Sequence, residues 1–429
     1  MIPADKPPVT AVMPEGALPP APRKSALALL RSVPAVLLET TRGGRPNAQG
    51  VVGSNNPTWV GAGNQRGAMD LMVVGIVLKN TTDVEDAWRA VEETFRHQDA
   101  QGHLGSDVTS DAFWMAWMNY ALLLLQQSEY ADTYKPKIQA LKPKFAKTME
   151  FLLKQSSKDE LRKANHGSPN RTLIIANAYA FGGLLLADVI SPETKKAYLA
   201  EADFWIRNEF ENDKLFRSFD GIFLEHGGYD TGYHGVALWM AIMHHLHFPN
   251  SIPNAEQKFA AASRWLENRI LPNGVVDCTF NTRSGPNNAI GDAKNTDLLG
   301  VKRALFYSGA LLGQSSAFDA AKRASQSING LPPVFFSAET VRGKKGIPFQ
   351  FDVLATNSGL KALDSSFTMS ASNLPSWLSF APGPYGFYKS TASLKLQGTP
   401  SSSGTFKVRL AGSNSYGDAV PVDLTVIIE

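Results

Sequence analysis

The sequence predicts a mainly helical protein, an incomplete (α/α) toroid of helical hairpins followed by a small C-terminal β-sandwich. From about residue 56 to 328, apolar residues recur at helical spacing in one segment after another, with almost no strand signal. After Leu331 the chain alternates apolar and polar residues, as strands do. Long loops between helices usually carry function. Such loops on one face of a helical array favour a toroid, in which inner helices surround a cleft. A plain helical solenoid is the competing architecture, but we find no fixed repeat period.

The helical domain is expected over residues 26–330, after a Pro-rich lead-in at residues 1–25. Proline removes a backbone donor and blocks helix, so the lead-in should be extended. Helix-like sequence begins at residues 25–40. The strongest helical patterns span residues 67–80, 83–98, 110–127, 134–155, 171–190, 193–210, 233–248, 255–270 and 298–314. The loops richest in Gly, Asn and Asp span residues 98–111, 163–170, 219–232 and 272–295.

Residues 331–429 are expected to form a β-sandwich of about 100 residues. Its alternating runs span residues 348–357, 366–374, 393–400, 404–414 and 420–428. The run LPSWLSF, the later LQGTPSSSGTFKVRLAGSNSYGDA and the terminal strand resemble the immunoglobulin-like domains appended to bacterial surface and secreted carbohydrate enzymes. The resemblance implies a spacer or accessory domain.

Composition limits the partners of this protein. The 429-residue chain carries a net charge of only +3, and its basic residues are scattered. We therefore expect no nucleic-acid partner, and an anionic ligand must be attracted by a local field. No apolar run has the length of a membrane span, and the single cysteine, Cys278, excludes an internal disulfide. A Pro-rich start often follows a removed targeting segment, so we expect a secreted or periplasmic protein.

The stretch from Asp220 to Leu238 combines histidines, tyrosines, carboxylates and glycines ahead of an apolar helical run. Glycines let the backbone approach a ligand closely, and His and Tyr exchange protons when their pKa values are shifted. This pattern predicts an active-site loop that enters a helix. The carboxylates Asp220 and Glu225 are interpreted mainly as structural groups that hold the loop.

The same stretch resembles the active-site segment of two groups of toroid enzymes. Its histidine and paired tyrosines resemble hyaluronate and chondroitin lyases, and its Asp-Gly, Glu and Tyr-His elements resemble alginate lyases. Both resemblances imply that Tyr233 is the catalytic tyrosine. The first also implies a catalytic histidine at His226, whereas the second has an arginine at that position.

A second constellation, ANHGSPNR at residues 164–171, precedes another apolar helix. Its Asn165-His166 pair resembles the Asn-His pair of alginate lyases, and the following Gly-Ser-Pro resembles a turn of hyaluronate lyases. In those families an asparagine binds the uronate carboxylate, which implies that role for Asn165, with Asn170 as the alternative. His166 could instead belong to a helix cap.

The implied reaction is β-elimination at a uronate, which removes a weakly acidic proton at C5. Donors and cations at the neighbouring carboxylate stabilise the transition state, each good donor by roughly 3 kcal/mol. A tyrosine can take the proton and return one to the leaving oxygen if nearby cations lower its pKa from the usual value of ~10. Arg283 is the favoured cation for this site, with Arg171 and Arg66 as substrate-binding candidates.

The remaining substrate-binding candidates are aromatic or imidazole side chains. Trp114 and Trp117 follow a polar loop and could stack on sugar rings, although their spacing also fits a buried helix stripe. Tyr229 and His234 flank Tyr233 and complete the set. The cluster of His244, His245 and His247 lacks a carboxylate partner, so packing is favoured over metal binding.

These observations predict a polysaccharide lyase that needs no cofactor and no metal and acts on an acidic polymer, with glucuronan and alginate favoured over hyaluronan and chondroitin. Two alternatives stay open. A glycoside hydrolase on the same toroid would pair Glu225 with Asp230 or Asp107. A non-catalytic carbohydrate-binding surface protein would use the helices as a scaffold.

Overall fold

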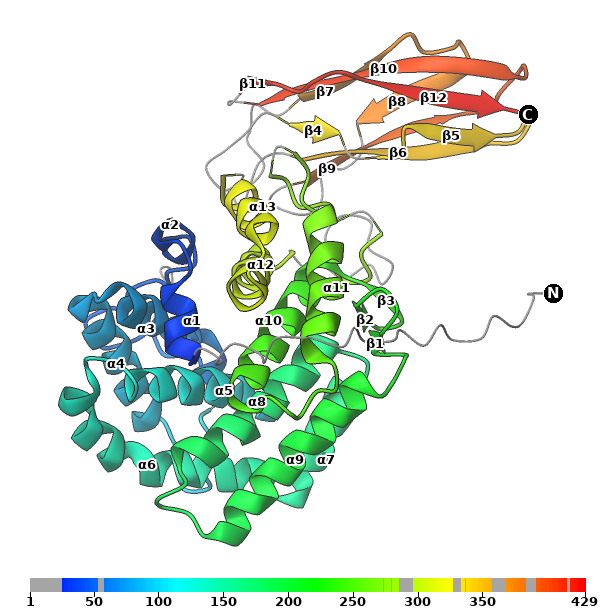
Figure 1. The fold of residues 1–429 in the computed structure, drawn as a ribbon. Helices are drawn as coiled ribbons and strands as arrows, with labels where there is room; N and C mark the ends of the chain where they lie inside the picture. Colours follow the sequence, from blue (N-terminus) through cyan, green and yellow to red (C-terminus); the bar gives the residue numbers. More distant parts are fainter. Residues whose placement is uncertain are drawn as a thin grey trace, which may run out of the picture.

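The computed structural model describes residues 25–52, 58–105, 107–272, 274–278, 280–284, 296–326, 333–335, 337–356, 368–382, 391–414 and 417–429. Figure 1 shows a body of helical hairpins followed by a separate pair of sheets, which confirms the predicted fold class. The predicted lead-in lies outside these residues, apart from Ser25. That residue caps the first helix by accepting a hydrogen bond from the backbone of Ala28.

The inner helices of the body are apolar on nearly every side, because they are covered by neighbours all round. They are α3 (Gly67–Leu78), α5 (Val108–Leu125), α8 (Pro169–Leu185), α10 (Thr231–His247) and α12 (Leu298–Leu312). The helices that follow them are α4 (Thr81–Arg96), α6 (Ala131–Leu153), α9 (Pro192–Phe210), α11 (Ala255–Asn268) and α13 (Ser315–Gln326). The shorter elements are α1 (Ala26–Arg31), α2 (Ala35–Glu39), η1 (Ala62–Gln65) and α7 (Gln155–Asn165).

Each inner helix packs on the outer helix that follows it and on the next inner helix, as α8 does on α9 and α10. Because an outer helix returns the chain each time, the inner helices run parallel and begin at one rim. Aspartates cap three of these beginnings. Asp107, Asp230 and Asp297 accept hydrogen bonds from backbone N–H groups in the first turns of α5, α10 and α12.

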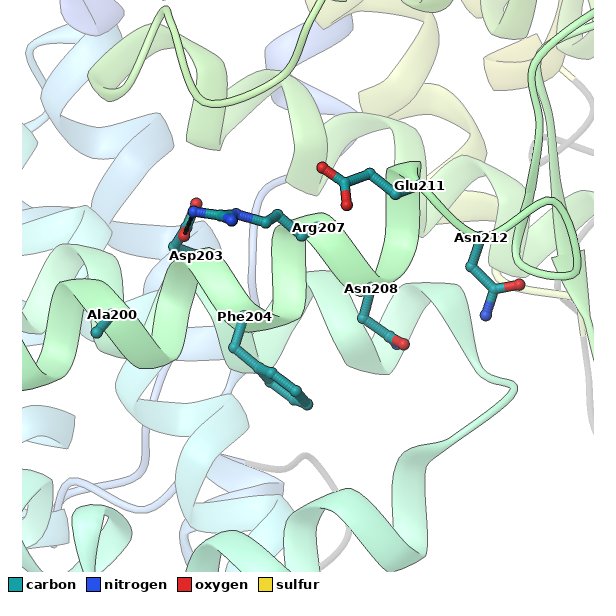
Figure 2. Close-up of a pocket in the computed structure, with 7 residues that line it drawn as sticks. All are labelled: Ala200, Asp203, Phe204, Arg207, Asn208, Glu211 and Asn212. Atoms are coloured by element: carbon teal, nitrogen blue, oxygen red, sulfur yellow. Dashed lines mark hydrogen bonds and ion pairs between the residues drawn. The ribbon is translucent and has the colours of Figure 1, made fainter.

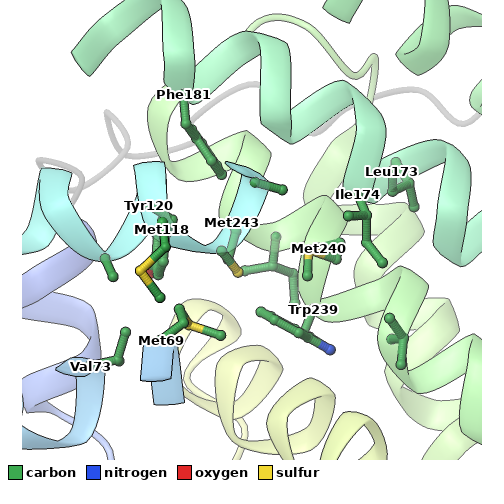
Figure 3. Close-up of a cluster of buried hydrophobic side chains, with 14 of the residues drawn as sticks. Met69, Val73, Met118, Tyr120, Leu173, Ile174, Phe181, Trp239, Met240 and Met243 are labelled. Carbon is green, nitrogen blue, oxygen red and sulfur yellow. The ribbon is translucent and has the colours of Figure 1, made fainter. Parts of the chain in front are cut away.

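The core lies between the inner helices. Figure 3 shows Met69 of α3, Tyr120 of α5, Phe181 of α8 and Trp239 of α10 pointing toward one another in this cluster. The hydroxyl of Tyr120 lies 3.1 Å from that of Tyr307, which joins α5 to α12. An ion pair of 2.5 Å between Arg303 and Asp70 links α12 back to α3. No described helix has both the length and the apolar character that a membrane span requires.

The stretch around Asp220 folds into a small antiparallel sheet, which the sequence analysis did not predict. It consists of β1 (Phe216–Arg217), β2 (Ile222–Glu225) and β3 (Gly228–Tyr229). The turn between β2 and β3 contains only His226 and Gly227, with φ of 51° and 84°. Two positive φ values match the twist of a tight hairpin. The hairpin therefore holds the His226 backbone in a fixed conformation directly after Glu225.

The C-terminal strands form two sheets around their own apolar core. Strands β5, β7, β10, β11 and β12 form one sheet, and β4, β6, β8 and β9 form the other. The strands are β4 (Val334–Phe335), β5 (Thr340–Gly343), β6 (Phe349–Thr356), β7 (Thr368–Ser372), β8 (Leu378–Pro382), β9 (Thr391–Gly398), β10 (Gly404–Asn414), β11 (Gly417–Asp418) and β12 (Val422–Ile428). Each strand predicted from alternation coincides with one of the longer strands of this sandwich.

Candidate functional site

The rim where the inner helices begin gathers arginines and aspartates from distant parts of the chain. Arg66, just before α3, lies within electrostatic range of Asp297, Asp107 and Arg171. The guanidinium of Arg171, in the first turn of α8, in turn acts on Tyr233 in the first turn of α10. Helix N-termini carry partial positive charge and attract anions. The rim is therefore suited to an anionic ligand.

Asp230 fixes the geometry on the α10 side of the rim. Its buried carboxylate accepts hydrogen bonds from the backbone N–H of Tyr233 at 3.1 Å and of Arg283 at 3.1 Å. It also accepts hydrogen bonds from the N–H and the hydroxyl of Ser284, at 2.6 and 2.7 Å. One carboxyl group thus caps α10 and ties residues 283 and 284 to the same point.

This anchoring places the Arg283 side chain at the centre of the site. Its Nη1 donates to Glu225 Oε1 at 2.7 Å and lies 3.4 Å from His226 Nε2. Its guanidinium lies over the ring of Tyr233, 5.4 Å from the ring centroid. The structure therefore brings three predicted catalytic residues, Arg283, His226 and Tyr233, into one cluster.

The pKa of Tyr233 differs from the value that a tyrosine base requires. Burial raises this pKa, and the opposing effects of Arg283 and Arg171 do not compensate. The expected lowering by nearby cations is therefore not found, because loss of solvent outweighs the arginines. Tyr233 is a neutral phenol in this site at neutral pH.

Glu225 is the buried acid of the cluster. Burial raises its pKa to about 7, against the lowering effect of Arg283. The hydroxyl of Ser168 donates to Glu225 Oε1 at 3.3 Å and lies 3.2 Å from His226 Nε2. A carboxyl group that titrates near neutrality inside a cluster of polar side chains is typical of sites that transfer protons.

The two predicted constellations meet at Gly167 and Ser168. The backbone N–H of His226 donates to the carbonyl of Gly167 at 2.8 Å, so the turn that carries His226 is fastened to the chain just before α8. Asn165 is fully buried, and its amide donates to the Leu161 carbonyl and the Thr109 hydroxyl. His166 is exposed, with Nδ1 2.8 Å from the Lys163 carbonyl.

The other candidates near α8 and α5 occupy the same rim. Arg171 Nη1 donates to the amide oxygen of Asn165 at 3.4 Å. Asn170 is buried, and its Oδ1 has no hydrogen-bond partner among the described residues. The guanidinium of Arg66 lies 4.9 Å from the ring centroid of Trp117. Arg66 and Arg171 thus extend the positive surface away from Arg283.

Several predicted ligand contacts belong to the packed interior. Trp114 is fully buried against Phe95 and Phe145, which fits the buried stripe named as its alternative. His234 is buried with both ring nitrogens in hydrogen bonds, and burial lowers its pKa to about 4, so it stays neutral. Tyr229, by contrast, is half-buried, and its ring meets Trp265 edge-on.

The carboxylates proposed for a paired hydrolytic mechanism have separate structural tasks. Asp230 is occupied by the hydrogen bonds described above, and the exposed Asp107 caps α5 through Ser110.

His244, of the histidine cluster, is buried, and its Nδ1 lies 3.0 Å from the amide oxygen of Asn177. Among the described residues, no group of three His, Cys, Asp or Glu side chains could hold a metal ion.

Sequence reasoning missed Ser168 and Phe280. Ser168 lies inside the predicted Gly-Ser-Pro turn, but nothing in the sequence shows that it contacts Glu225. Phe280 is 78% exposed and has a φ of 60°, which is unusual for a bulky residue. It immediately precedes the anchored residues 281–284. An exposed aromatic ring on a fixed backbone beside the site is suited to contact with a sugar ring.

A separate groove lies on the outer side of α9. Figure 2 shows the side chains that line it, among them Phe204 and an ion pair between Arg207 and Asp203. It contains none of the predicted site residues. The rim of the inner helices therefore remains the candidate site.

Comparison with known proteins identifies the C-terminal part. Residues 332–429 match the profile of the family described as "Putative Ig domain", which confirms the predicted immunoglobulin-like resemblance. No curated protein sequence matches the chain.

Solved structures of carbohydrate-active enzymes are similar to parts of the chain. An unsaturated glucuronyl hydrolase from a Bacillus species, described as responsible for glycosaminoglycan degradation, is 13% identical, with a TM-score of 0.41, over 70% of this chain and 81% of its own. A putative alpha-galactosidase from Bacteroides fragilis is 22% identical, with a TM-score of 0.18, over 23% of this chain. A putative alpha-galactosidase/melibiase from that species is 23% identical, with a TM-score of 0.19, over 24% of this chain. The matches span only 18% and 19% of these two proteins.

The raised pKa of Glu225 predicts a specific pH dependence of stability. A carboxyl group whose folded pKa is about 7 rather than 4.5 favours the folded state below pH 4.5 and loses that contribution as pH rises through 7. Glu225→Gln cannot ionise. Between pH 4.5 and 8, the free energy of unfolding measured by urea denaturation should therefore fall further in the wild type than in the variant. The difference between the two losses should be up to about 3 kcal/mol. Equal losses in both proteins would contradict this assignment.

Proposed function

We propose that the rim binds an acidic polysaccharide and cleaves it by β-elimination at a uronate residue. The observation that carries this proposal is the position of the Arg283 guanidinium, which lies over the ring of Tyr233 and within hydrogen-bonding distance of Glu225 and His226. Arg66, Arg171 and the N-termini of the inner helices add positive charge along the same rim. A uronate polymer offers one carboxylate per acidic sugar to such a surface.

The reaction removes the proton at C5, breaks the bond between C4 and the glycosidic oxygen and forms a double bond between C4 and C5. The departing oxygen takes a proton. We assign this donation to Tyr233, because its raised pKa keeps the phenol protonated. His226, whose side chain is 40% exposed, is the candidate base at C5.

The arginines stabilise the charge that develops on the sugar carboxylate as the C5 proton leaves. Arg283 is already oriented by Glu225 before substrate arrives, so little reorganisation is needed in the transition state. The alginate-lyase pattern has an arginine where this chain has His226. In this protein, Arg283 brings a guanidinium from a distant part of the chain to 3.4 Å from His226 Nε2. Glucuronan and alginate are the polymers we favour.

Hydrolysis is the second candidate, because a buried carboxyl group with a pKa of about 7 is also suited to a general acid. In that mechanism Glu225 would protonate the glycosidic oxygen and a second group would activate water. Asp230 is committed to its hydrogen bonds with residues 233, 283 and 284. Of the two aspartates considered as the second carboxylate of a hydrolase, this leaves the exposed Asp107.

Product analysis distinguishes the two reactions. Incubation with glucuronan, alginate, hyaluronan and chondroitin should release ends that absorb ultraviolet light, because elimination leaves a conjugated double bond.

Tyr233→Phe should lower kcat by about 10²–10⁴-fold with little change in polymer affinity. Reducing ends without this absorbance would indicate hydrolysis and contradict the proposal. Polymer binding without any product would indicate a binding protein.

Phe280 should contribute to substrate affinity by stacking on a sugar ring. Phe280→Ala should raise KM by roughly 2–10-fold and leave kcat nearly unchanged, because the exposed ring is assigned to binding alone. Phe219→Ala is the matched control, since Phe219 is 81% exposed but lies in the turn between β1 and β2. An equal KM for Phe280→Ala and wild type on the cleaved polymer would exclude this role.

A further inference from the structure

Glu209, in the last turn of α9, is a buried acid that the proposed reaction does not use. Its side chain is 0% exposed, and neither carboxyl oxygen has a hydrogen-bond partner among the described residues. Burying a carboxylate without a partner costs far more than burying a neutral carboxylic acid. Glu209 is therefore expected to retain its proton.

Strand β2 contacts the end of α9, which brings Glu225 toward Glu209. The ring centroids of Phe210 and Phe223 are 5.9 Å apart, which joins these two elements. Side chains two residues apart on a strand point to the same face. Glu225 therefore points to the same side as Phe223, toward the end of α9. Consistent with this placement, Glu225 acts electrostatically on Glu209.

Glu225 leaves one oxygen available on this side. Its Oε1 receives the hydrogen bonds from Arg283 and Ser168, whereas Oε2 is buried and has no partner among the described residues. Two neighbouring buried carboxyl groups thus present three oxygens that lack a donor. One proton held between them supplies a donor, and two adjacent carboxylates cannot both ionise away from water.

We propose that Glu209 and Glu225 form a carboxyl–carboxylate pair that shares one proton, with Glu209 as the positioning residue that retains it at neutral pH. Glu225 is then free to hold its negative charge against Arg283. The consequence for catalysis rests on the proposed function, whereas the proton sharing itself does not.

The charged and titratable groups around this pair come from several elements. Arg283, His226, Asp230 and Tyr233 surround Glu225, and Glu225 itself is the group that acts on Glu209. Burial and Glu225 both raise the pKa of Glu209. When Glu225 gains a proton, its attraction for Arg283 weakens. The ionisation of Glu225 thus controls how firmly the guanidinium is held beside Tyr233.

The test is a pH titration of both side chains in the full-length protein. The protonation of each side chain is monitored through the carboxyl ¹³C chemical shift of labelled glutamate. In the wild type, Glu209 should keep the shift of a protonated acid at pH 7. In Glu209→Gln, which has no acidic proton to share with the Glu225 carboxylate, the Glu225 midpoint should move up by about one pH unit. Glu201→Gln is the matched control, because Glu201 is also buried on α9 but pairs with Arg162.

Two results would overturn the proposal: an ionised Glu209 at pH 7 in the wild type, or an unchanged Glu225 midpoint in Glu209→Gln. The first needs no variant, so it remains decisive if Glu209→Gln does not fold. If the protein cleaves the polymer, kcat should change with pH near neutrality. The pH at which it changes should shift in the same direction as the Glu225 midpoint. A shifted midpoint in a protein that forms no unsaturated product would support the pair and refute the elimination reaction.

Discussion

The geometry of the site depends on the carboxylate of Asp230. This buried group accepts hydrogen bonds from the first turn of α10, from the backbone N–H groups of Arg283 and Ser284, and from the Ser284 hydroxyl. Hydrogen bonds to both carboxyl oxygens satisfy this group away from water. It fixes two chain segments about fifty residues apart, so that the Arg283 guanidinium lies over the Tyr233 ring. Neither side chain would be oriented by its own helix or loop alone.

The buried carboxyl groups at this end of the protein differ in the hydrogen-bond donors that surround them. Asp230 is saturated with donors, Glu225 has donors on one oxygen only, and Glu209 has none among the described residues. Burial then raises the pKa of Glu225 and Glu209. Burial raises the pKa of Glu225 to about 7, so changes of pH near neutrality alter the charge that faces Arg283.

The sequence predicted the helices and the C-terminal strands because their apolar spacing extends over many residues. It did not predict the hairpin at His226, whose strands are only two to four residues long. The Asn165-His166 pair was expected to act beside Tyr233, but the contact with His226 is made by Gly167 and Ser168. Spacing along one segment cannot show such a contact. Glu209 gave no signal, because a charged residue in an amphipathic helix ordinarily faces water.

In the proposed reaction, the guanidinium held between Glu225 and Tyr233 stabilises the transition state of elimination. Chemical rescue tests it most directly. Arg283→Ala should lower the initial rate of unsaturated product formation by about 10²–10³-fold. Guanidinium ion at millimolar concentration should restore part of that rate, while equal concentrations of sodium chloride or urea should not. Full activity of Arg283→Ala without any added cation would contradict the account.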